Sequence, residues 1–459
     1  MRLIVFMLLV TALHAAPRPN IIFIVADDQR PDTIHALGNV VIETPNLDRL
    51  VARGTTFTRA YAGYPICHVS RAQILTGTHA FKALPQYPGG SIDPNLATLA
   101  RTFQKAGYYT CYTGKWHNDG QPMQRGYTTT SGLYSSGGGK GITQPEIDDR
   151  GRPLTGYRGW TFKDADNNAE LDKGVGLQPD NSRFIAYGAM HAIATAPKHH
   201  PFLLHINFAF PHDPRQWPAG MKNSYDPAKM PLPANFAAKH PFDHGNIDGR
   251  DELLLPTPRT EAAVREELAI YYAMITDLDA QLGRILDTLA TTGHADDTII
   301  IFTSDQGLAL GNHGLLGKQN QYEHSIRSPL IICGPGLPRG ERTVALANLN
   351  DLFPTLCDLV GIPVPDSVQS KSLAPLLRHQ AKHIHDFVTG MYTDTQRMIC
   401  DERWKFIVYP KVNRMQLFDL ANDPYELRDR SADPAHQTKR DELQAKLQAW
   451  RQANGDPNL

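Results

Sequence analysis

The stretch NIIFIVADD, residues 20–28, runs from apolar side chains directly into two carboxylates. An apolar run that follows Pro17 and Pro19 in this way predicts a buried β-strand. Comparable runs recur along the chain at residues 202–208, 298–303 and 329–333. Helix-like stretches lie between several of these runs. This alternation predicts an α/β fold with a largely parallel sheet.

The clearest helical pattern extends from about Glu261 to Leu289, where apolar side chains recur at three- and four-residue spacing. Gly293 is expected to end this helix. After about Pro365 the pattern changes. Strand-like segments at 398–400, 404–409 and 416–419, followed by a charged helical segment at 438–450, predict a small antiparallel sheet with a terminal helix.

Composition places few limits on the fold but several on the function. The 459 residues are 41% hydrophobic and 20% charged, which is enough for one large core and a smaller satellite domain. Lys plus Arg (46) nearly cancels Asp plus Glu (47), so no global field draws the protein onto nucleic acid or an anionic membrane. Any bound anion must be held by a local cluster.

The N-terminus has the layout of a secretory signal peptide. Met1 and Arg2 precede an apolar run over residues 3–13, and His14-Ala15-Ala16 supplies a small-residue cleavage site. The run is too short to span a bilayer, and the better strand at 20–25 argues against a buried first strand here. We expect a signal peptide at 1–16, a large domain at 17–379 and a C-terminal subdomain at 380–459, in a secreted or periplasmic protein.

The five cysteines are scattered, odd in number and free of any CxxC pair. They therefore indicate neither a disulfide scaffold nor a zinc knuckle. Cys111 and Cys333 lie in apolar runs and are interpreted as core thiols. Cys67 differs, because it lies in a polar turn region between Pro65 and Arg71.

Polar residues follow three of the predicted strands. In open α/β sheets, ligands bind beyond the carboxyl ends of the strands. Asp27-Asp28, Pro211-His212-Asp213 and Ser304-Asp305-Gln306-Gly307 occupy these places. Clustered carboxylates repel one another unless a cation binds between them, and oxygen ligands suit calcium or magnesium. Helix caps or solvated turn acids are the alternative reading of such residues.

Further motifs follow in order along the chain: PICHVSRAQILTG at 65–77, GKWH at 114–117, PH at 211–212, SDQG at 304–307, and Lys318. Together they resemble the formylglycine-dependent sulfatases, a branch of the alkaline phosphatase superfamily. The resemblance extends from Asn20 to LFDLANDP at 417–424. It implies an alkaline-phosphatase-like fold: a large mixed, mostly parallel sheet flanked by helices, with a smaller C-terminal antiparallel-sheet subdomain.

The resemblance also implies a modified nucleophile and a metal ion. A maturing enzyme would oxidise Cys67 to formylglycine, whose hydrate attacks sulfur and then collapses to the aldehyde, expelling sulfate. One calcium ion would be held by Asp27, Asp28, Asp305, Gln306 and the modified side chain of Cys67.

Six catalytic positions carry over from the family in the same way. Besides Cys67 itself, Arg71 would anchor the nucleophile, and Lys115, His212 and Lys318 would surround the sulfate. His117 would be the base for the second hydroxyl. His212 or Lys318 would be the acid for the leaving group.

Two positions depart from the family pattern. Val69 stands where Pro, Ala or Ser is common, and its β-branched side chain restricts the extended conformations that a modifying enzyme would require. Gln306 stands where Asn or His is usual, which keeps an amide oxygen but adds a methylene.

For other polar residues the sequence allows both a functional and a structural interpretation. If its segment is extended, His68 alternates away from Cys67, so it is either packed or a substrate contact. His313 either reaches the pocket or lies outside it. Within the long loop 216–258, four residues either contact a sugar or belong to a polar loop: His240, Asp243, His244 and Arg250.

The expected activity is hydrolysis of a sulfate ester, on a sulfated small molecule or glycan. A phosphate monoester, diester or phosphonate hydrolase of the same superfamily is one alternative. An inactive glycan-binding relative, in which Cys67 stays a thiol, is another. No nucleic-acid partner and no stable membrane span are expected.

Overall fold

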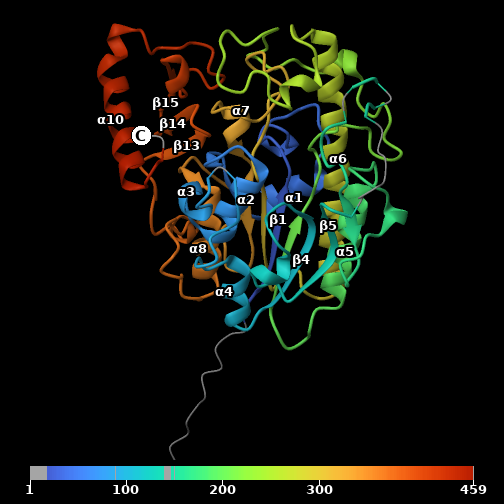
Figure 1. Ribbon diagram of the computed structural model, residues 1–459. Coiled ribbons are helices and arrows are strands. Elements are labelled where there is room, and N and C mark those ends of the chain that lie inside the picture. The colour runs from blue at the N-terminus through green and yellow to red at the C-terminus, as the bar shows by residue number, and fades with distance from the viewer. Residues whose placement is uncertain (1–17, 88, 139–145, 149, 153, 458–459) are drawn as a thin grey trace, which may run out of the picture.

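The computed structural model describes residues 18–87, 89–138, 146–148, 150–152 and 154–457. A large sheet with helices on both sides forms the body, and a smaller sheet with the C-terminal helix lies beside it (Figure 1). The expected signal peptide, 1–16, lies outside the described residues. Within the described part, no helix is long and apolar enough to cross a membrane.

The large sheet is mixed and mostly parallel, as predicted. Its central strands β8, β1, β7, β4 and β5 run parallel, whereas β10 and β6 are antiparallel to their neighbours. Within the described residues its order is β11 (Glu341–Thr343), β2 (Thr55–Phe57), β10 (Leu330–Cys333), β8 (Thr298–Ser304), β1 (Asn20–Ala26), β7 (Phe202–Asn207), β4 (Tyr109–Trp116), β5 (Thr129–Ser135), β6 (Thr161–Lys163).

Strand β1 is apolar throughout because helices cover both faces of the sheet. Ile22 and Ile24 pack in a cluster with residues of α1, α5 and α6, whereas Ile21, Phe23 and Val25 pack with residues of α2, α4 and α8. The α-helices are α1 (Pro45–Arg53), α2 (Cys67–Thr76), α3 (Ala80–Ala83), α4 (Leu99–Lys105), α5 (Asn181–Ala194), α6 (Glu261–Thr291), α7 (Glu323–Ile326), α8 (Leu352–Leu359), α9 (Ala374–Leu377) and α10 (Gln437–Ala453).

Helix α6 confirms the longest predicted helix. Its first turn is capped by Thr260, whose side chain accepts a hydrogen bond from the amide of Ala263. It ends next to Gly293, which has a φ of 83°.

The C-terminal antiparallel sheet is also confirmed. It consists of β13 (Val388–Tyr392), β14 (Gln396–Cys400), β15 (Trp404–Tyr409) and β16 (Arg414–Asp419). Leu443 and Leu447 of α10 pack against it. A three-stranded sheet of β12 (Ala347–Asn348), β3 (Ala60–Tyr61) and β9 (Arg327–Ser328) completes the fold. The domain boundary at 379/380 stays a prediction.

All five cysteines are buried and free.

Two segments differ from the sequence expectation. Strands β4 and β5 were not anticipated from the sequence. The region around Cys67 is a helix, α2, rather than an extended segment. Cys67 and Arg71 therefore lie one helical turn apart and on the same face.

Gly114 lies at an irregularity in β4, where the register with β5 shifts between Tyr112 and Gly114. Its φ is 84°, and a Cβ atom there would lie 2.0 Å from the backbone oxygen of Asn207. Neither the conformation nor the space admits a side chain.

Gly114→Ala should therefore lower the free energy of unfolding by roughly 2–4 kcal/mol, from left-handed strain plus the clash. Gly107→Ala is the matched control, since Gly107 has a φ of 91° with nothing within 4 Å of an added Cβ atom. Denaturant unfolding of both variants measures the difference. Equal destabilisation would show that the contact with Asn207 costs nothing.

Candidate active site

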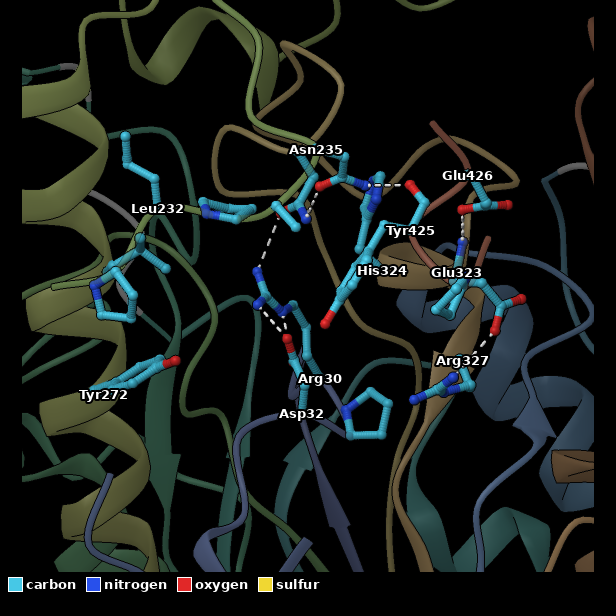
Figure 2. Close-up of a pocket in the computed structure, with 17 residues that line it drawn as sticks. Arg30, Asp32, Leu232, Asn235, Tyr272, Glu323, His324, Arg327, Tyr425 and Glu426 are labelled. Atoms are coloured by element: carbon cyan, nitrogen blue, oxygen red, sulfur yellow. Dashed lines mark hydrogen bonds and ion pairs between the residues drawn. The ribbon is translucent and has the colours of Figure 1, made fainter. Parts of the chain in front are cut away.

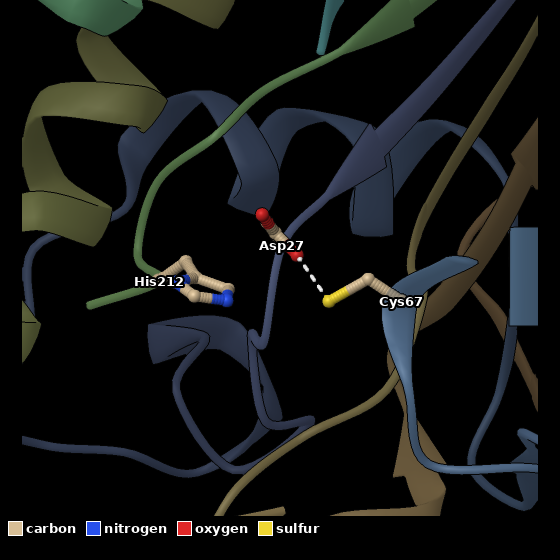
Figure 3. Close-up of side chains that lie close together, drawn as sticks. All are labelled: Asp27, Cys67 and His212. Atoms are coloured by element: carbon tan, nitrogen blue, oxygen red, sulfur yellow. Dashed lines mark hydrogen bonds between the residues drawn. The ribbon is translucent and has the colours of Figure 1, made fainter. Parts of the chain in front are cut away.

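The predicted site residues come together at the carboxyl ends of the parallel strands. Asp27 and Asp28 follow β1, Asp305 follows β8, and Lys115 lies near the end of β4. Figure 3 shows Asp27, Cys67 and His212 gathered around one point. Parallel strands aligned in this way bring their ends to one edge of the sheet.

Cys67 is the first residue of α2 and is only 2% exposed. Its Sγ atom lies 3.2 Å from Oδ1 of Asp27, 3.1 Å from Nε2 of Gln306 and 3.2 Å from Nζ of Lys318. A helix begins here, so its free N–H groups and dipole favour negative charge beside the Cys67 side chain.

Asp28 has a backbone conformation that lets two consecutive carboxylates reach one cluster. Successive residues of a strand point to opposite faces, but the φ of Asp28 is 69°, in the left-handed region. The turn is held by the hydroxyl of Tyr271, which donates to the carbonyl of Asp28 at 2.6 Å. The amide of Asp28 donates to Oδ1 of Asp305 at 3.1 Å.

Each of the three carboxylates has a buried cationic partner. Lys318 Nζ lies 2.7 Å from Oδ2 of Asp28, and Arg71 Nε donates to Oδ2 of Asp305 at 3.0 Å. Lys115 pairs with Asp27. These three cations balance the three carboxylates, so any further positive charge at the site must come from elsewhere.

Burial and neighbouring charges together shift the pKa values of Asp27 and Asp28 in opposite directions. Burial raises the pKa of Asp28 to about 7, with Lys318 lowering that value and Asp27 raising it. For Asp27, burial also acts to raise the pKa, but the neighbouring cations, Lys115 first among them, hold it well below its usual value. The negative charges of Asp27 and Asp305 raise the pKa of Asp28, and a bound cation would reduce this repulsion.

The donor atoms fit a hard divalent cation. One ligand atom from each of Asp27, Asp28, Cys67 and Asp305 lies within 4.8 Å of the others. Oε1 of Gln306 is a buried oxygen without a hydrogen-bond partner. Three carboxylates with a spare amide oxygen are an oxygen-rich set, which suits calcium or magnesium rather than zinc.

A pocket of about 270 Å³ opens above this cluster. Five of the predicted catalytic residues line it: Cys67, Lys115, His117, His212 and Lys318. Arg71 lies behind the pocket, 3% exposed, where it holds Asp305. The other lining residues are Ile66, Thr155, Gly156, Tyr157, Trp160, Arg250 and Gln319.

Several residues at the site were not predicted. The hydroxyl of Tyr157 donates to Asp27, and the Oδ1 atom of Asn207 accepts a hydrogen bond from Arg71. Asn207 ends β7, so the strand-end argument that found Asp27 could have found it. Tyr157 and Trp160 lie outside the regular strand pattern, and no sequence signal marks them.

For six polar residues the sequence left two interpretations open. Of these six, Arg250 is the one found among the described residues that line the pocket. His240 Nδ1 contacts the carbonyl of His313 at 3.0 Å, and His244 Nδ1 lies 3.1 Å from Nε2 of Gln396. His313 stacks on Tyr322. His68 packs near His117, with ring centroids 5.9 Å apart.

A chain of polar contacts orients His212. Nδ1 of His212 lies 2.6 Å from the backbone carbonyl oxygen of Asp213 and 3.1 Å from its Oδ1 atom, and Arg250 holds both carboxylate oxygens of Asp213 at 2.9 Å. The Nε2 atom of His212 faces Asp28 at 3.8 Å.

Asp213→Asn should therefore lower kcat by roughly 10–100-fold while leaving KM nearly unchanged, because His212 keeps its backbone contact and its place in the pocket but loses the negative charge beside Nδ1. Asp243→Asn is the control, because Asp243 is an exposed residue of a loop. Steady-state kinetics of both variants test this, and an unchanged kcat for Asp213→Asn would remove the orienting role.

Residues 19–362, more than half of the chain, match the family model described as Sulfatase. The chain belongs to the sulfatase family. Its residues 311–453 also match the model described as the C-terminal part of N-sulphoglucosamine sulphohydrolase. The protein is therefore a sulfuric ester hydrolase of the alkaline phosphatase superfamily.

Known relatives span nearly the same length as this sulfatase. The arylsulfatase of Clostridium perfringens is 30% identical over 439 residues, covering 89% of each chain. The choline-sulfatase of Rhizobium meliloti is 28% identical over 444 residues, covering 91% of the sulfatase and 83% of the relative.

Solved structures share the fold of the sulfatase. One, described as a complex with its substrate D-glucosamine-2-N,6-O-disulfate, has a TM-score of 0.78 at 23% identity, with 96% and 98% of the two chains covered. The phosphonate monoester hydrolase of Silicibacter pomeroyi has a TM-score of 0.77 at 25% identity, with 96% and 97% covered.

Proposed function

We propose that this sulfatase hydrolyses a sulfate ester on a sugar, with a formylglycine made from Cys67 as nucleophile and one calcium ion at Asp27, Asp28, Asp305 and Gln306. One observation carries the proposal. Cys67 lies at the helix start beneath the 270 Å³ pocket, in contact with both the carboxylate cluster and a buried lysine.

The modification and the metal would each supply one kind of chemistry. Formylglycine offers, as its hydrate, one oxygen that attacks sulfur and a second hydroxyl through which sulfate is released. Calcium adds positive charge beside that oxygen and the sulfate.

The remaining work falls to residues that line the pocket. Lys115, His212 and Lys318 line the pocket together with Cys67, and we propose that they donate hydrogen bonds to the sulfate oxygens and to the leaving oxygen. Arg71, through Asp305, holds the cluster in place from behind. We propose His212 or Lys318 as the acid for the leaving group.

The walls of the pocket support a sugar as the group that carries the sulfate. Tyr157 and Trp160 pack edge to face with centroids 5.0 Å apart and form an aromatic side. Thr155, Arg250 and Gln319 supply polar atoms. A sugar ring offers an apolar face and hydroxyl groups to such a mixed wall. The similar fold of a protein solved with a sulfated glucosamine agrees with this.

Sulfate release from a panel of sulfated monosaccharides and oligosaccharides tests the substrate class. We expect kcat/KM for at least one sulfated sugar to exceed that for a simple aryl sulfate. Turnover of aryl sulfate alone, with every sulfated sugar inert, would contradict the proposal.

A phosphonate or phosphate ester hydrolase is the alternative supported by a relative. The Silicibacter pomeroyi enzyme is a phosphonate monoester hydrolase, and the Trinickia caryophylli relative, 26% identical, is described as a multifunctional alkaline phosphatase superfamily protein. The charge of the substrate distinguishes the two candidate activities. Lys115, Lys318 and Arg71 are each neutralised by a carboxylate, so the charge of a bound metal is the net positive charge that remains for the substrate.

A sulfate monoester carries one negative charge, whereas a phosphate monoester carries about two at neutral pH. We therefore expect the enzyme to favour p-nitrophenyl sulfate over p-nitrophenyl phosphate by about 10²-fold or more in kcat/KM. A phosphonate monoester of the same phenol, with one charge, is the control. Faster cleavage of the phosphate would move the assignment to phosphatase chemistry.

His117 is proposed as the base that acts late in the reaction. It lines the pocket, its Nδ1 atom is buried without a partner, and burial lowers its pKa well below the ordinary value. The ring is thus neutral and able to accept a proton.

His117→Ala should release about one equivalent of leaving alcohol per active site in a fast burst, while steady turnover falls by about 10²–10⁴-fold. Rapid-quench kinetics measure the burst, and His68→Ala, which changes a neighbouring ring outside the pocket, serves as control. Loss of the burst together with turnover would place His117 in the first step instead.

Export and maturation are proposed from the sequence. Residues 1–16 would be removed as a signal peptide, and a formylglycine-generating enzyme would act on Cys67. N-terminal sequencing of protein recovered outside the cytoplasm tests the first point, and mature protein that still begins at Met1 would contradict it.

A further inference from the structure

A second pocket, of about 340 Å³, lies apart from the catalytic one. None of its described lining residues lines the catalytic pocket. Figure 2 shows Tyr272 and Leu232 on one side, His324 and Tyr425 on the other, and Arg30 between them. Its volume is at the small end for ligand sites, enough for one or two rings.

Apolar side chains make up much of its wall. Tyr272 and Leu232 face the pocket from one side, and four prolines contribute to the lining. Tyr425 is 55% exposed, so a large aromatic ring stands open at the edge. Its backbone carbonyl accepts a hydrogen bond from Asn235 at 2.9 Å, which fixes the segment that carries it.

Polar atoms in the wall lack partners. His324 is 8% exposed, and neither Nδ1 nor Nε2 has a hydrogen-bond partner. The Nε atom of Arg327 is also buried without one. Burial lowers the pKa of His324 well below its ordinary value, so the ring offers one donor and one acceptor. The two nitrogens lie on different edges of the ring, so two hydroxyl groups, one donating and one accepting, would satisfy it.

The charges around this pocket cancel in pairs. Arg30 Nε lies 2.8 Å from Oδ1 of Asp32, and Arg327 lies 3.3 Å from Glu323. Glu426 lies 2.9 Å from Lys405, just behind the wall. An ionic ligand would gain little net attraction from a balanced set of this kind.

We propose that this pocket binds a neutral saccharide ring, stacked on Tyr425 and hydrogen-bonded through its hydroxyls to His324. The balanced charges disfavour an anion, while the aromatic ring at the edge and the buried imidazole without partners favour a ligand that has an apolar face and hydroxyl groups. This binding is independent of the chemistry at Cys67.

Saturation-transfer NMR on the full-length protein tests the proposal, with cellobiose and N,N′-diacetylchitobiose as probes. Inorganic sulfate in excess occupies the catalytic pocket during the measurement. We expect saturable binding of at least one probe that persists with sulfate present.

Two variants locate the binding. Tyr425→Ala removes the exposed ring but keeps the backbone contact to Asn235, and His324→Phe keeps a ring but removes both nitrogens. Each should weaken binding about tenfold. Tyr187→Ala, another exposed tyrosine at 48%, is the matched control and should bind normally. Thermal unfolding of each variant confirms that it is folded.

Two sources of the saccharide are distinguished by turnover. If the ring belongs to an unsulfated part of the substrate, Tyr425→Ala raises KM for long sulfated oligosaccharides but not for p-nitrophenyl sulfate. If the ring is a separate sugar, both KM values stay unchanged and only disaccharide binding is lost.

Three results would overturn the proposal. The first is that neither probe binds, which would mean that the pocket holds only water. The second is that sulfate displaces the probes. The third is that the wild type and both folded variants bind the probes with equal affinity.

Discussion

Replacing Cys67 with alanine is expected to abolish sulfate ester hydrolysis, lowering kcat by at least about 10⁴-fold. The reason is chemical: only an oxidised cysteine offers two hydroxyls on one carbon, and an unmodified thiol has no comparable route to release sulfate. Burial and the carboxylates of Asp27 and Asp305 also raise the pKa of the Cys67 thiol, which keeps it protonated. Sulfate release by the purified variant measures the loss.

Cys111→Ala is the matched control, since both cysteines are 2% exposed and only Cys67 touches the carboxylate cluster. It should retain activity. Across preparations from different hosts, activity should rise in proportion to the fraction of formylglycine at position 67, measured by mass spectrometry of the peptide. Full activity with an intact thiol would refute the mechanism, and a thiol without activity in the native host would favour an inactive glycan-binding relative.

Removing the divalent metal is expected to lower activity by about 10³-fold or more, which corresponds to the several kcal/mol that a metal supplies at such a site. Asp27, Asp28 and Asp305 should then repel one another, so the apparent Tm should also fall. Chelation followed by metal analysis and activity assay tests both effects.

Calcium should restore turnover after chelation, and zinc should not, because the donors are oxygen atoms. Asp305→Asn should lower the affinity for the metal without removing a pocket-lining residue, since Asp305 lies beneath the pocket. Unchanged turnover in protein shown to be free of metal would disprove the metal assignment.

The central sheet could be predicted because its strands are covered on both faces. Burial of β1 and β8 leaves continuous apolar runs, which the sequence shows directly. Strand β4 was missed because it reads YTCYTGKW, with threonines, a glycine and a lysine that are buried all the same. Lys115 has no exposure at all, since Asp27 pairs with it, and that pairing is invisible in the sequence.

The site was predictable where residues follow strands or lie in a dense motif. Asp27 and Asp305 follow buried strands, and Cys67 and Arg71 belong to one segment whose helical form was nevertheless missed. Tyr157 and Trp160 reach the pocket through tertiary folding, so local pattern could not place them. His313, which had two readings from the sequence, stacks on Tyr322 and lies 5.8 Å from the ring of His324, and this packing is not visible in the local pattern.

The burial of Cys67 sets an order of events during biosynthesis. Its contacts join positions far apart in the chain: Asp27 lies 40 residues before it and Lys318 lies 251 residues after it. Once β8 and the Lys318 segment have docked, the sulfur is closed off from any protein-sized catalyst. An enzyme that oxidised this side chain would therefore have to reach it while the C-terminal half is still unfolded or unsynthesised, so the proposed maturation would precede the last stage of folding and could not repair a finished molecule.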